Sequence, residues 1–243
     1  WLLTNSIESA QRKVEERNFA IRRDVLQFDD VMNRQRELIY SQRDMVLNGE
    51  NVRDYIIGMI KESIESNCKT FLSDVDSQET WNIDGLREFY AGWLINGDDL
   101  NFDGQQLASI EREDIISMLT DRAMEIYNAK EKQYGEEMMR EIERVILLKT
   151  VDRYWMDHID NMDELRRGIH LRAYGQKDPV VMYRLEGFDM FDQMIDSIRE
   201  DTARLMLTVQ IKSEEQPKRE QVAKPTFTSA DGTDKKRPVR KTA

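Results

Sequence analysis

Residues 5–47 read NSIESAQRKVEERNFAIRRDVLQFDDVMNRQRELIYSQRDMVL, and this stretch decides the fold class of the chain. Apolar side chains recur in it three or four positions apart, or at twice that spacing: Ile7, Ala10, Val14, Ile21, Val25, Phe28, Met32 and Ile39. Charged side chains fill the other faces, so the pattern predicts one amphipathic helix that a left-handed turn at Asn48–Gly49 ends. At about 1.5 Å per residue this helix is roughly 60 Å long, too long for one globular core. We therefore expect other elements to pack against it.

A second pair of long helices is predicted further along the chain. Apolar residues at helical spacing support one helix over residues 136–167, which Gly168 ends. Asp178, as N-cap, and Pro179, as first helical residue, begin the next helix, which runs to about residue 212. Two long helices joined by the short segment 169–177 should fold back as an antiparallel hairpin.

The remaining segments are a helical insert and a tail. The insert has predicted helices over Val52–Leu72, Asp84–Ile95 and about Gln105–Tyr134. The tail carries three prolines and almost no apolar side chains, which predicts disorder. The expected fold is all-α and elongated, with four parts: a long helix at 1–47, an insert at 48–135, a hairpin at 136–212 and a disordered basic tail at 213–243.

Composition limits the classes of function. Of the 243 residues 40% are apolar and 34% charged, a balance typical of long helices with narrow apolar seams. The net charge of -11 argues against general nucleic-acid binding, which depends on Lys and Arg. Because the chain opens at Trp1, with no charged-then-apolar leader and no apolar run near 18 residues, we expect part of a longer protein without a signal peptide or a membrane span.

The candidate sites for metals and catalysis are weak. Asp99, Asn101 and Asp103 match the first half of a calcium loop, but its twelfth position is Ile110 rather than a bidentate Glu, which favours a polar turn. His158, His170 and the single cysteine, Cys68, cannot form a structural zinc site or a disulfide, and one cysteine suits a reducing compartment. We expect His158 to be a hydrogen-bonded residue of the helix seam. No GxxxxGK[ST] loop is present, so we expect no catalytic residue, metal or bound cofactor.

The connector of the predicted hairpin is more informative. It places five side chains at the far tip of the two helices: His170, Arg172, Tyr174, Gln176 and Lys177. Tyrosine combines an apolar ring with a polar hydroxyl at low rotamer cost, so Tyr174 could contact varied peptide surfaces. In the alternative interpretation Tyr174 folds back onto its own helices as a cap. The residues alone favour the cap, because loop tips are usually only turns.

Four stretches, taken in order, resemble the C-terminal part of the SecA family, the ATP-driven motor of bacterial preprotein translocation. They are AQRKVEERNF at 10–19, FDDVMN at 28–33, MDELRRGIHLRAY at 162–174 and QKDP at 176–179. The resemblance implies that 1–47 is the long helix of the helical scaffold, 48–135 the helical wing, and 136–212 the two-helix finger with the return of the scaffold. It also implies that Tyr174 is the finger-tip tyrosine that contacts the translocating polypeptide, which reverses the preference for a cap.

The resemblance further implies the setting in which the chain acts. The nucleotide-binding domains, with their ATP and Mg²⁺, and the preprotein-crosslinking domain should precede Trp1. Expected partners are unfolded preprotein, a SecYEG-type membrane channel and the parent's own motor domains, at the cytoplasmic face of the inner membrane. A homodimer stays an open alternative. The family's C-terminal Cys/His segment is absent, which leaves chaperone and lipid binding open. The alternatives from other classes are a standalone coiled-coil adaptor and, less favoured, a calcium sensor.

Overall fold

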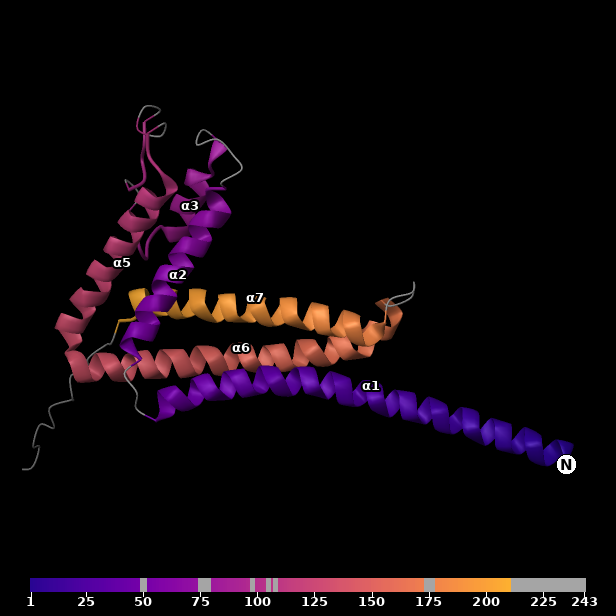
Figure 1. The fold of residues 1–243 in the computed structure, drawn as a ribbon. Helices are drawn as coiled ribbons and strands as arrows, with labels where there is room; N and C mark the ends of the chain where they lie inside the picture. The colour runs from indigo at the N-terminus through magenta and orange to yellow at the C-terminus, as the bar shows by residue number, and fades with distance from the viewer. Residues whose placement is uncertain are drawn as a thin grey trace, which may run out of the picture. The chain divides into compact units, whose positions relative to one another are not determined.

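The computed structural model describes residues 1–48, 52–73, 80–96, 99–103, 106, 109–172 and 178–210, except for the side chains of residues 2 and 170–172. Within these residues the regular secondary structure is helical, apart from one isolated bridge between Ala91 and Ile95. The helices are α1 (Leu2–Leu47), α2 (Arg53–Phe71), α3 (Ile83–Tyr90), α5 (Arg112–Tyr134), α6 (Glu136–Arg172) and α7 (Pro179–Thr208) (Figure 1). The predicted all-α class is confirmed.

The hairpin predicted from residues 136–212 is present as α6 and α7. Arg153 of α6 forms an ion pair with Asp201 of α7, and the Tyr154 hydroxyl donates to the same carboxylate at 2.8 Å. Further along α6, the Met162 side chain lies against Gly187 of α7. Residue numbers rise on α6 as they fall on α7, so the two helices are antiparallel. The predicted start of α7 is also confirmed, because Asp178 Oδ1 accepts a hydrogen bond from Val180 N at 2.8 Å and Pro179 opens the helix.

Several predicted helix boundaries are wrong. The helix predicted from about Gln105 begins at Arg112, and the helix predicted to run to about residue 212 ends at Thr208. The helix predicted to stop at Gly168 runs on to Arg172, because Ile169 is completely buried, and this burial offsets the cost of about 1 kcal/mol that a helical glycine carries. The helix predicted over residues 84–95 ends at Tyr90, since Ala91 is extended and Gly92 has a φ of +80°. The left-handed conformation predicted after the first helix rests on Gly49, which lies outside the described residues.

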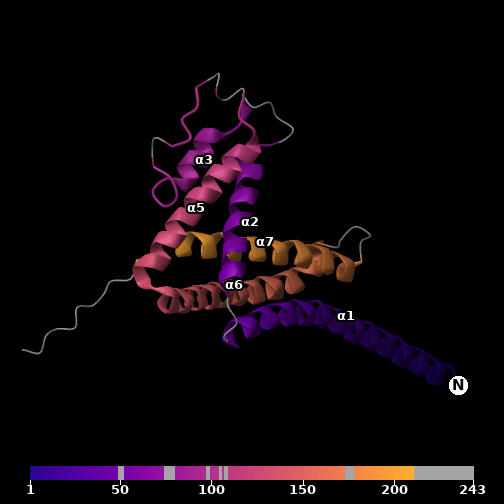
Figure 2. The same cartoon turned by 60° about the vertical axis from the view of Figure 1, so that its left-hand side comes forward.

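The second half of α1 packs against the hairpin (Figures 1 and 2). Its buried apolar residues are Phe28, Ile39 and Val46. Two ion pairs, Asp29–Arg166 and Arg43–Asp152, join α1 to α6 and show that these helices run in opposite directions. The first half of α1 differs, because its apolar side chains are exposed; Phe19, for example, is 65% exposed. The long helix is therefore covered by this chain only from about Phe28 onward.

The insert packs through α2 and α5 onto the other end of the hairpin (Figure 2). Its core is built from Ile60, Ile64 and Cys68 of α2, with Leu86 and Tyr90 of α3. The same apolar core continues into α6 and α7 through Leu147, Val151 and Met206. Residues Trp1–Val209 accordingly form one compact unit. The boundaries predicted at 47/48 and 135/136 stay predictions.

Candidate functional site

The predicted polypeptide-contacting site is the tip of the hairpin. Tyr174, Gln176 and Lys177 lie outside the described residues. His170 and Arg172 belong to the last turn of α6, but their side chains also lie outside the described part of the chain. The structure describes the two helix ends that flank the connector, the end of α6 and the start of α7.

A separate apolar cluster holds these helix ends together. We call it the tip cluster; its members are Phe28, Met162, Leu165, Ile169, Val180 and Tyr183. The rings of Phe28 and Tyr183 meet edge to face, with centroids 4.7 Å apart. Burial raises the pKa of Tyr183 to about 12. Because the cluster draws on α1, α6 and α7, the ends of the connector are fixed by three helices rather than two.

A polar contact crosses the same three helices next to this cluster. Gln35 of α1 donates from its amide nitrogen to the Gly187 carbonyl of α7 at 2.9 Å. The amide oxygen lies 2.9 Å from His158 Nε2 of α6, which therefore carries the proton and donates. Burial lowers the pKa of His158, and its ring contacts those of Trp155 and Phe191, each with its centroid 5.7 Å away. The prediction that His158 is a hydrogen-bonded seam residue is confirmed.

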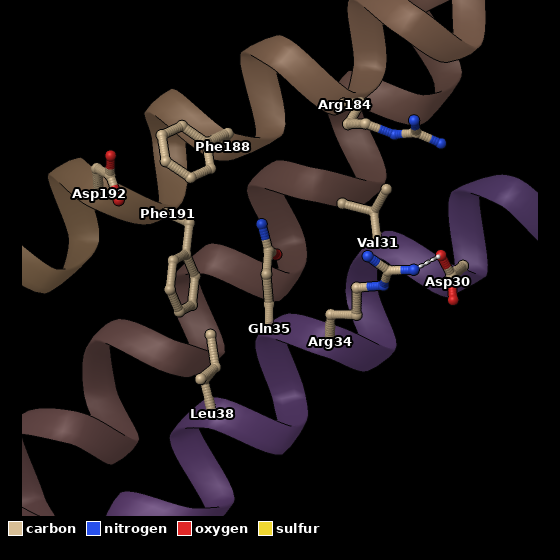
Figure 3. Close-up of a pocket in the computed structure, with 9 residues that line it drawn as sticks. All are labelled: Asp30, Val31, Arg34, Gln35, Leu38, Arg184, Phe188, Phe191 and Asp192. Carbon is tan, nitrogen blue, oxygen red and sulfur yellow. Dashed lines mark ion pairs between the residues drawn. The ribbon is translucent and has the colours of Figure 1, made fainter.

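A groove opens beside this contact, between α1 and α7 (Figure 3). Its volume is about 440 Å³, and its lining is Asp30, Val31, Arg34, Gln35, Leu38, Arg184, Phe188, Phe191 and Asp192. Figure 3 shows Phe191 directed toward α1 near Leu38, while Arg34 is held by Asp30 at 3.1 Å. Four of these nine residues are apolar and five are charged or polar, and none is a histidine, cysteine, serine or lysine. The groove can accommodate an apolar side chain, but it offers no nucleophile and no paired acid and base.

Sequence reasoning missed a buried polar cluster where the insert meets the hairpin. Tyr127 of α5 donates to the Glu143 carboxylate of α6, and Arg140 donates to Glu143 at 2.9 Å and also to Glu131. Arg53 of α2 lies 3.5 Å from Glu131. Burial raises the pKa of Glu143 above its usual range, while the hydrogen bond from Tyr127 and the charge of Arg140 oppose the rise. A sequence signal existed, because Glu143 lies four residues after Met139 and four before Leu147, on the buried face.

Two residues of the calcium-loop candidate, Asp99 and Asp103, form hydrogen bonds with nearby backbone N–H groups. Asp99 Oδ2 accepts from Asn96 N at 2.7 Å, and Asp103 Oδ1 accepts from Gln106 N at 2.8 Å. These bonds support a polar turn at this position. Among the described residues no group of three or more His, Cys, Asp or Glu side chains could hold a metal ion. Cys68 is buried, which raises its pKa to about 12 and leaves the thiol unreactive.

None of the described helices is both long and apolar enough to cross a lipid bilayer. This result covers the long helices α1, α6 and α7, which carry charged side chains along their whole length.

Comparison with known proteins gives one consistent result. A family model described as the SecA wing and scaffold domain matches residues 1–210. The protein translocase subunit SecA of Alkaliphilus oremlandii is 48% identical over 239 residues, which cover 98% of this chain and 26% of that protein. The same subunit of Clostridium tetani is 46% identical over 242 residues, which cover 99% of this chain and 28% of that protein. The SecA subunit of Acetivibrio thermocellus is 42% identical over 238 residues, which cover 98% of this chain and 26% of that protein.

The chain thus spans about a quarter of the length of the curated relatives it matches. The resemblance carried by the four sequence stretches is confirmed, and it extends well beyond them into the insert. Because α1, the insert and the hairpin all lie inside the matched region, the chain belongs to the SecA family and corresponds to its wing and scaffold domain.

Proposed function

We propose that this chain is the mechanical and polypeptide-contacting part of an ATP-driven protein translocase. In this proposal ATP and Mg²⁺ are bound by motor domains outside the chain, and the chain passes the movements of these domains to a preprotein. The names of its relatives support a role in protein translocation. The wider setting follows as part of the proposal: unfolded preprotein as substrate, a SecYEG-type channel as partner, and a site at the cytoplasmic face of the inner membrane.

The observation that carries the proposal is the bracing of the hairpin by α1. The tip cluster joins the ends of α6 and α7 to Phe28 of the long helix, so the connector stands on a rigid base. The apolar residues of the first half of α1 remain exposed. We assign this half to contacts with the motor domains, which would move α1 and, through it, the hairpin. Tyr174 would then press or hold the polypeptide, with His170, Arg172, Gln176 and Lys177 beside it.

Site-specific photocrosslinking in the complete translocase tests this assignment. A photoreactive residue at position 174 should capture a translocating polypeptide in the presence of ATP. The matched control is the same residue at Lys149, an exposed position on α6 at the far end of the same hairpin. If the translocating polypeptide were captured equally at positions 174 and 149, the hairpin tip would not be the polypeptide-contacting site.

The rival interpretation, a standalone coiled-coil adaptor, requires the seam of α1 to be free for partner helices. From Phe28 onward that seam is buried against the chain's own hairpin, which supports the translocase. Sizing and solution scattering separate the two functions. The translocase part should be a monomer whose hairpin packs on α1, whereas a rod-like dimer joined along the whole of α1 would favour the adaptor.

A further inference from the structure

Gln35 is an unusual residue for its position. It lies in the seam of α1 between Met32 and Ile39 and is only 7% exposed. Burying a primary amide costs free energy unless its donor and acceptor both find partners, so apolar residues normally fill such positions. The stability of the seam therefore does not explain why a glutamine stands at position 35.

Each end of the Gln35 side chain is bonded to a different helix. Its oxygen accepts from His158 of α6, and its nitrogen donates to the Gly187 carbonyl of α7, each at 2.9 Å. A helix carbonyl has a second lone pair, so Gly187 can accept this bond while remaining in its helix. One side chain of α1 thereby contacts both halves of the hairpin at a single level.

The hairpin helices also pack tightly at this level. A Cβ atom on Gly187 would lie 2.7 Å from the methyl carbon of Met162 and 3.3 Å from its sulfur. Glycine inside a helix lowers helix stability, and here it lets α7 approach Met162 of α6 closely. The carbonyl that Gln35 reaches is thus held at one height relative to α6.

Apolar seams discriminate poorly between registers that differ by one helical turn. Around Gln35 the facing seam residues are Phe28, Met32 and Ile39 on α1, and Trp155, Met162 and Leu165 on α6. A shift of one turn, about 5 Å, would still place apolar side chains opposite one another. It would, however, move Gln35 away from His158 to face Trp155 or Met162, leaving two buried polar groups without partners. The flanking ion pairs Asp29–Arg166 and Arg43–Asp152 are partly exposed, and such pairs contribute little.

We infer that the contact among Gln35, His158 and Gly187 is a register lock, which fixes the axial position of α1 along the hairpin. Gln35 is a positioning residue in this inference, and its effect on function would act through the hairpin. Buried polar residues set register in the same way in helical coiled coils. The inference goes beyond the proposed function and does not depend on it, because it concerns distances inside this chain alone.

The test measures register separately from stability. Spin labels are attached at Arg22 of α1 and Lys149 of α6, both exposed, in the whole chain carrying Cys68→Ala. Double electron–electron resonance should give one narrow distance distribution for this parent. The double substitution Gln35→Leu with His158→Phe removes both polar groups while keeping similar side-chain volumes. It should retain a cooperative unfolding transition but add a second distance displaced by about 5 Å, or broaden the distribution by that amount.

Two further variants complete the experiment. Gln42→Leu makes the same chemical change on the same helix, away from the contact, and should leave the distribution unchanged. Gln35→Asn keeps an amide that is one methylene too short to bridge both helices, and it should broaden the distribution even if the double variant does not fold. A single parental distance in both Gln35→Asn and the double variant would overturn the register lock, whatever their unfolding temperatures.

Discussion

Glu143 illustrates how one polar residue connects the insert to the hairpin. Its carboxylate is fully buried and accepts hydrogen bonds from Tyr127 of α5 and from Arg140 of α6. Arg140 also bonds to Glu131, which lies near Arg53 of α2. Removing one member of such a network leaves the others buried without full compensation, so its members act together.

The titration of Glu143 gives a pH prediction. A carboxyl whose pKa is raised above 4.5 in the fold binds its proton more tightly there than in the unfolded chain, so its ionisation destabilises the fold as the pH rises through that window. Glu143→Gln removes this ionisation. The unfolding free energy of the variant relative to that of the natural chain should therefore improve as the pH rises above about 4.5, the ordinary pKa of the carboxyl. Urea unfolding at several pH values measures the difference, with Glu141→Gln, the same change at an exposed position on α6, as the matched control.

At the scale of the helix, Gly168 and Gly135 have opposite roles. Gly168 lies within α6, and a Cβ atom there would meet nothing within 4 Å. Gly135 separates α5 from α6 with a φ of +84°, a conformation that side chains disfavour. The first glycine is tolerated by the helix, whereas the turn requires the second.

Two alanine substitutions test this contrast. Gly168→Ala should stabilise the chain by about 0.5–1 kcal/mol, because alanine favours the helix that glycine weakens. Gly135→Ala should destabilise it by about 1–3 kcal/mol, because alanine is strained at that backbone conformation. Chemical unfolding of both variants provides the comparison. A stabilising Gly135→Ala would mean that the turn does not need glycine.

The two halves of α1 also differ in a way that substitutions can measure. Phe28 is 4% exposed and lies in the tip cluster, whereas Phe19 is 65% exposed. Phe28→Ala should lower the unfolding free energy by about 3–5 kcal/mol. Phe19→Ala on the same helix should change it by no more than about 0.5 kcal/mol. Equal losses for the two would indicate that the first half of α1 is covered within the chain, contrary to its exposure.

Sequence patterns predicted the long elements because each depends on a regular seam or a strong boundary. The seam of α1 and the Asp178–Pro179 start of α7 belong to this class. The pattern failed at Gly168, because the tertiary burial of Ile169 overrides a local stop signal. It also missed Gln35 and Glu143, since a polar residue on a helix is assigned to solvent unless its partners on other helices are known. The role of Tyr174 could not be predicted from its loop chemistry alone and rested on resemblance.

For the molecule as a whole, the continuous core from the insert to the hairpin makes residues Trp1–Val209 one unit. The last described contacts of this unit lie at the end of α7, where Lys130 of α5 donates to the Val209 carbonyl. Gln210, the last described residue, lies outside this unit. The stability of the first unit should therefore not depend on the tail.

Deletion of residues 211–243 tests this independence. The shortened chain should unfold at the same temperature and with the same cooperativity as the full one, because the apolar core of Trp1–Val209 is left complete. Differential scanning calorimetry of the two chains measures both quantities. A marked fall in the unfolding temperature would show that the tail packs against the core.

Between Leu2 and Leu47 the helix α1 contains neither glycine nor proline. Sharp kinks in helices arise mostly at such residues, so this helix has no built-in hinge. A torque applied to the exposed first half of α1 should therefore rotate the helix at Gln35 in the same direction. Inserting a glycine pair near Arg22 would interrupt that torsional coupling while leaving every packed residue in place.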